Sequence, residues 1–98
     1  MANFLTSGNG PTPGGVFVQY GISIPTVVKS ARGILFRVSV TTAGTTAGSV
    51  YDFTSTTSPQ NLVGIIPDAV GVYEFLWPCQ TGIVIVPGTS QVVSVSFE

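Results

Sequence analysis

Residues 34–41 read Ile-Leu-Phe-Arg-Val-Ser-Val-Thr, and apolar side chains recur in this stretch at every second position. A period of two is that of an extended strand, whose successive side chains point to opposite faces of a sheet. The stretch therefore predicts a β-strand with one apolar face. That face comprises Ile34, Phe36, Val38 and Val40, and the opposite face comprises Leu35, Arg37, Ser39 and Thr41.

Seven further segments are predicted as short strands, because Val and Ile dominate them and Gly, Pro and Asp separate them. Short strands that recur about every 8–12 residues are typical of a sandwich or barrel. The sequence thus predicts an all-β protein, a compact antiparallel β-sandwich or jelly-roll-like barrel of about eight strands, with residues 16–98 as one domain. The seven segments are 16–20, 24–29, 49–54, 61–66, 70–77, 83–86 and 93–97.

Residues 1–15, MANFLTSGNGPTPGG, hold four glycines and two prolines and show no strand pattern. Such a composition predicts an extended N-terminal arm. Phe4 and Leu5 are its apolar pair. We expect these two side chains to dock on a groove, either of this domain or of a neighbouring chain.

The chain is poor in charge, since only 7% of its 98 residues are charged against about 25% in an average soluble protein. Three basic residues, Lys29, Arg32 and Arg37, stand against four acids. Phosphate contacts need many more Lys and Arg, so no nucleic-acid partner is expected. The apolar runs are too short for a membrane helix and the N-terminus lacks the pattern of a signal peptide, so no membrane partner is expected either.

No residue is predicted to be catalytic, cofactor-binding or metal-binding. Histidine is absent and Cys79 is the one cysteine, which excludes a His/Cys metal cluster within the chain. General acid–base chemistry needs two carboxylates that face one cleft, and nothing in the spacing of the four acids predicts such a pair. The sequence favours a protein without enzymatic activity. The four acids are Asp52, Asp68, Glu74 and Glu98.

The run Ile83–Val86, IVIV, has no polar face. Such a strand is covered on both sides, either by two layers of its own domain or by another subunit. Val84 and Val86 are therefore candidate partner contacts. With few charges to protect its strand edges from pairing, the domain is expected to self-associate.

Tyr73, Phe75 and Trp77 alternate along one predicted strand and so share one face. Aromatic side chains in such a row serve as core, as an intersubunit contact or as a platform for a sugar. All three residues are candidate partner contacts, and the three uses remain open at this point.

The stretch from Val28 to Phe97 resembles a group of small structural proteins of tailed-phage virions. Its strand-and-turn motifs carry the likeness, and the arm is left unmatched. The matching motifs are VKSARGILFRVSVTTAGTTAGSVYD at 28–52, IIP at 65–67 and TGIVIVPGTSQVVSVSF at 81–97.

The resemblance implies a capsid decoration (cement) protein or head-fibre module. Such a protein would be made in the host cytoplasm, form a homotrimer and bind the major capsid protein on the exterior of the head. The alternative is a tail or fibre module that binds a host-surface glycan. Exposed, clustered Tyr and Trp side chains would favour this alternative.

Overall fold

The computed structural model describes residues 17–98, which form eight strands and, within that range, no helix. The all-β prediction is confirmed. Phe4 and Leu5 lie outside the described residues, so their predicted docking stays a prediction. The strands are β1 Phe17–Ile22, β2 Thr26–Lys29, β3 Gly33–Thr42, β4 Gly48–Tyr51, β5 Leu62–Ile66, β6 Gly71–Cys79, β7 Ile83–Val86 and β8 Val92–Phe97.

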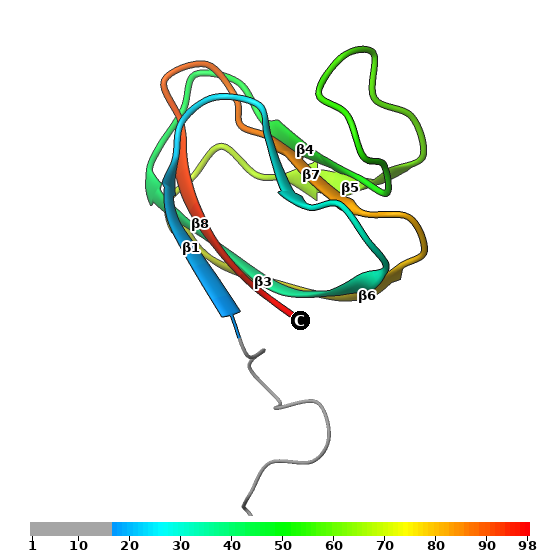
Figure 1. Cartoon of the computed structure of the whole chain (residues 1–98). Helices are drawn as coiled ribbons and strands as arrows, with labels where there is room; N and C mark the ends of the chain where they lie inside the picture. The colour runs from blue at the N-terminus through cyan, green and yellow to red at the C-terminus, as the bar shows by residue number, and fades with distance from the viewer. Residues whose placement is uncertain (1–16) are drawn as a thin grey trace, which may run out of the picture.

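The eight strands form two four-stranded antiparallel sheets, with orders β1-β8-β3-β6 and β2-β7-β4-β5 (Figure 1). Strand β1 pairs with β8, β2 with β7, β3 with β6 and β4 with β5. The pairing is therefore nested: the first strand pairs with the last, the second with the seventh, and so on to β4 and β5, which are consecutive in the chain. An eight-stranded double sheet with this nested pairing is a jelly roll.

The core lies between the two sheets and is built from β-branched and aliphatic side chains. Such side chains fit a pleated surface that is buried on one face. Both sheets contribute completely buried residues, so the two layers share one apolar interior. The cluster comprises Ile22, Leu35, Val38, Val40, Val50, Ile66, Cys79, Ile83, Ile85, Val93 and Val95.

The register of β3 corrects the predicted faces of this strand. Its pairing with both β6 and β8 shifts between Leu35 and Arg37, so that Phe36 lies in an irregular step. A bulge of this kind reverses the faces beyond it. Leu35, predicted on the polar face, is therefore completely buried in the core cluster together with Val38, whereas Phe36 is buried outside that cluster.

Strands β5 and β6, at the ends of their sheets, meet across the core. A Cβ atom added at Gly64 of β5 would lie 3.0 Å from the ring of Phe75 of β6. Phe75 packs against the core cluster, so the glycine makes room for its ring. These two strands thus form one side of the sandwich.

The loops β3–β4 and β7–β8 bind each other at one end of the sandwich. The backbone N–H of Thr45 donates to the carbonyl of Thr89, and the N–H of Thr89 donates to the hydroxyl of Thr46. The buried amide of Gln91 adds two bonds, because its Oε1 accepts from the N–H of Gly88 and its Nε2 donates to the carbonyl of Pro67. Three loops are held together in this way.

Candidate functional site

The acidic side chains do not come together. The Asp52 carboxylate, at the end of β4, accepts hydrogen bonds from the β6–β7 turn, and Glu74 pairs with Arg37 at 3.4 Å. Within residues 17–98 no three His, Cys, Asp or Glu side chains lie close enough to hold a metal ion.

Asp52 is the best-connected polar side chain of the described chain. Its Oδ2 accepts from the N–H of Gln80 at 2.8 Å, and its Oδ1 accepts from the N–H of Thr81 at 2.8 Å and that of Gly82 at 3.2 Å. The Thr81 hydroxyl also donates to Oδ1, at 2.8 Å. We call this arrangement the Asp52 clamp. It ties the end of β4 to the turn before β7.

The hydrogen bonds of the Asp52 clamp lower the pKa of the Asp52 carboxyl. Partial burial raises the pKa of Asp52, but the hydrogen bonds from Gln80, Thr81 and Gly82 favour the charged form and outweigh burial, so the pKa lies below its ordinary value. A carboxyl with a lowered pKa is a poor general acid or base near neutral pH. The hydrogen bonds of the Asp52 carboxylate connect the end of β4 to the β6–β7 turn.

Replacing Asp52 with Asn is expected to lower the free energy of unfolding at pH 7. The expected loss is about 1–2 kcal/mol, below the range for fully buried bonds to a charged group because the carboxylate is partly solvated. The wild-type contribution is fully present above the unfolded pKa of about 3.9 and is lost as the pH falls through the lower folded pKa.

The difference in thermal midpoint between wild type and Asp52→Asn should therefore narrow between pH 5 and pH 2, as followed by circular dichroism. The other acidic residues are the same in both proteins, so the difference between the two midpoints reports on Asp52. If the thermal midpoints of the two proteins differed by the same amount at every pH between 5 and 2, the Asp52 clamp would not contribute to stability as proposed.

Cys79 is not a nucleophile in this fold. Its side chain is completely buried in the core cluster. Burial, assisted by the negative charge of Asp52, raises the pKa of its thiol to about 11. Because the thiolate is the reactive form, the native thiol is inert at neutral pH.

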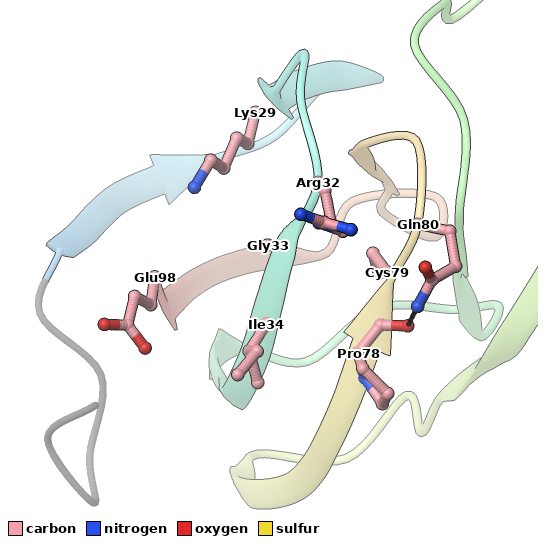
Figure 2. A pocket seen from close by; sticks show the side chains of 8 residues that line it. All are labelled: Lys29, Arg32, Gly33, Ile34, Pro78, Cys79, Gln80 and Glu98. Atoms are coloured by element: carbon pink, nitrogen blue, oxygen red, sulfur yellow. Dashed lines mark hydrogen bonds between the residues drawn. The ribbon is translucent and has the colours of Figure 1, made fainter. Parts of the chain in front are cut away.

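A cavity of about 360 Å³ opens beside Cys79, at the end of the sandwich where the chain finishes (Figure 2). Two basic side chains, Lys29 and Arg32, and the carboxylate of Glu98 stand around it. The amide of Gln80 is turned to the carbonyl of Pro78, to which its Nε2 donates at 3.3 Å. Glu98 is the one acidic residue among those that line this cavity, so the cavity does not hold a pair of carboxylate side chains.

The three aromatic residues of β6 do not have the same exposure. Tyr73 and Phe75 are half-buried against the core cluster, and the Tyr73 hydroxyl donates to the carbonyl of Ala69 at 2.8 Å. Trp77 is 48% exposed at the edge of its sheet, beside Leu76, which adopts a left-handed conformation with φ of 52°. Tyr73 and Phe75 thus serve as core, and Trp77 alone of the three is a surface residue.

The two candidate contacts of β7 differ. Val84 is completely buried by the chain itself, although it lies outside the main core cluster. The expectation that Val84 contacts a partner is corrected, because its side chain has no exposed surface. Val86 is half-buried opposite Ser49 on β4, so it keeps some surface for a contact.

Most of the exposed apolar side chains of the described residues lie in one stretch of the chain, which comprises β5, β6 and the loop between them. Of the ten large apolar side chains that are exposed within the described range, six lie between residues 62 and 77. None of the alternation arguments selected these residues except Trp77. We call them the apolar side: Leu62, Ile65, Val70, Val72, Leu76 and Trp77.

A second cavity, of about 290 Å³, lies on the outer face of the β1-β8-β3-β6 sheet and was not predicted. Directly paired residues of neighbouring strands share a face, and Ser94 pairs with Ser39 while Ser96 pairs with Arg37. Tyr20, 80% exposed, stands at one side. We call this cavity the hydroxyl groove. Its lining residues are Val18, Tyr20, Arg37, Ser39, Thr41, Val72, Ser94, Val95 and Ser96.

Comparison with family models, with curated proteins and with solved structures finds no match to this chain. No helix among the described residues is long and apolar enough to cross a membrane. A function must therefore be inferred from the geometry of the surface.

Proposed function

We propose that this chain is a non-enzymatic structural protein of a phage virion, a capsid decoration (cement) protein that forms a homotrimer and binds the exterior of the head. The observation that carries the proposal is the apolar side, which holds six of the ten large apolar side chains that are exposed within residues 17–98. Exposed apolar surface of this extent is typical of proteins that bind other proteins. Enzymatic activity is not part of the proposal.

Two properties of the domain support a role in assembly. Its charge is low, with a net charge of −1, so two copies can approach each other with little electrostatic repulsion. Its jelly-roll architecture is shared by many capsid domains. This likeness of fold supports the proposed role in a virion by analogy only.

The mechanism is mass action. A protein that binds only the assembled head stabilises it in proportion to the logarithm of its concentration over its dissociation constant. Trimerisation adds avidity, because three linked copies bind three neighbouring capsid subunits at a high effective concentration. Val86 and the apolar side provide the contact surface in this proposal, and Phe4 and Leu5 of the arm remain candidate contacts with the capsid or with a neighbouring copy.

Charging the apolar side is expected to break the trimer before it affects folding. Ile65 is 54% exposed on β5, so Ile65→Lys should change the free energy of unfolding by no more than about 0.5 kcal/mol. Buried in an interface, the same lysine would carry an unpaired charge out of water. Light scattering at low micromolar concentration should give three times 10.1 kDa for the wild type and 10.1 kDa for the variant.

The matched control is Ile24→Lys, which charges a residue that is 68% exposed between β1 and β2, away from the apolar side. This variant should remain trimeric. A monomeric wild type, or a trimer that survives Ile65→Lys, would contradict self-association through the apolar side. Cosedimentation with heads of the phage that encodes the chain tests the capsid role, and wild type left in the supernatant would overturn it.

A further inference from the structure

We infer that the hydroxyl groove binds a neutral pyranose sugar, with the ring of Tyr20 as its apolar platform and Ser96 as a hydrogen-bonding residue on its floor. The inference does not depend on the proposed role in the virion. It rests on a cavity, an unpartnered hydroxyl and an exposed aromatic ring that the fold brings together from strands far apart in the sequence.

The first observation is the state of Ser96. Its Oγ is buried, yet it makes no hydrogen bond, and it is the one such side-chain atom of residues 17–98. A buried hydroxyl without a partner costs about 1–3 kcal/mol. Since native proteins satisfy nearly all such groups, an unpaired one calls for a partner. Because Ser96 lines the groove, a rotation of its side chain about the Cα–Cβ bond would present the hydroxyl to a ligand hydroxyl there, which supplies the missing partner.

The second observation is the position of Tyr20. It is the most exposed of the large apolar side chains of residues 17–98, at 80%, and it lines the same cavity as Ser96. A tyrosine offers an apolar ring face together with a polar tip. The carbon-bound hydrogens on one side of a pyranose ring pack against such a face, while its hydroxyls remain free to bind the floor.

The third observation is the chemistry of the floor and the rim. Hydroxyl side chains donate and accept hydrogen bonds equally well, as sugar hydroxyls do. Ser39 and Ser94 pair directly on the floor. Beside them, the guanidinium of Arg37 and the carboxylate of Glu74 lie 3.4 Å apart, which places a donor group next to an acceptor group.

The size and charge of the groove narrow the class of ligand. A volume of about 290 Å³ is at the lower end of the range of small-molecule sites, which begins at about 300 Å³. It suits one sugar unit rather than a long chain. The positive charge of Arg37 is offset by Glu74, so an uncharged sugar fits better than an acidic one.

The test is a titration of the full-length, isotopically labelled protein with methyl α-glucoside, methyl α-mannoside, methyl β-galactoside and N-acetylglucosamine, followed by amide chemical shifts. We expect at least one of the four to shift the amides of residues 18–20, 37–41 and 94–96 in a saturable manner. Tyr20→Ala and Ser96→Ala should each weaken its affinity by about tenfold, which corresponds to 1.4 kcal/mol.

Ser96→Ala separates binding from folding. Removing a hydroxyl that has no partner should leave the thermal midpoint unchanged or raise it, while affinity for the sugar falls. Trp77→Ala is the aromatic control and should leave the affinity unchanged. Three results would overturn the inference: no shifts with any of the four sugars, shifts that follow Trp77 instead of Tyr20, or an affinity that Ser96→Ala leaves unchanged.

Discussion

Leu35→Ala is expected to destabilise the domain far more than Ile34→Ala. Leu35 is completely buried in the core cluster, so truncating it removes apolar contacts and leaves a cavity. Leu→Ala changes in such positions cost about 2–5 kcal/mol. With about 4–8 °C per kcal/mol for a domain of this size, the thermal midpoint should fall by at least about 8 °C.

Ile34 is the matched control, because it is the neighbouring residue and is similar in size. The simple alternation of residues 34–41 places Ile34 in the core and Leu35 on the surface, but the bulge at Phe36 reverses this order. Ile34 is only partly buried, so Ile34→Ala should cost about 1 kcal/mol. Denaturant unfolding of both variants measures the difference. Equal losses, or a larger loss at Ile34, would show that β3 has no bulge in solution.

Gly88→Ala is the second substitution for which a large effect is expected. A Cβ atom at this position would overlap with the backbone carbonyl of Thr46. The carbonyl cannot move aside easily, because Thr45 and Thr46 are hydrogen-bonded to Thr89. The two loops would have to separate, which would also strain the bond from the Gly88 N–H to the buried amide of Gln91. We expect a loss of about 3 kcal/mol.

Gly21→Ala controls for the effect of replacing any glycine. Gly21 has a φ of 66°, in the left-handed region, but no atom lies within 4 Å of an added Cβ. Its cost is therefore backbone strain alone, about 1–2 kcal/mol. The thermal midpoint of Gly88→Ala should be lower than that of Gly21→Ala, and both should be lower than that of the wild type. The reverse order would mean that the two loops do not approach each other as closely as the structure shows.

The candidate sites show which exposed residues can be predicted from the sequence alone and which cannot. Because alternation separates the two faces of each strand, it identified residues such as Val86 and Trp77 that keep exposed surface. It could not show that Val84 is covered by its own chain, because burial on the outer face of a sheet depends on loops that pack there. Nor could it select Leu62 or Ile65, whose exposure follows from the position of β5 at the end of its sheet.

The hydroxyl groove shows the same limit. Ser94 and Ser96 are recognisable in the sequence as the outward-facing residues of a strand, and Tyr20 lies in another predicted strand. Their proximity depends on the pairing of β8 with both β1 and β3. Residues that are separated by more than 70 positions along the chain carry no local signal of such a pairing.

The sequence by itself determined the class of fold and the eight strands, because a period of two and the residues that end a strand are local properties of the chain. It also determined the low charge, which follows from composition. Only the tertiary structure decided which strands pair, where the bulge at Phe36 reverses the faces of β3, and which outward-facing side chains gather into a groove or an apolar side. These features depend on hydrogen bonds and packing between distant segments, whose relative positions are fixed only when the two sheets close around one core.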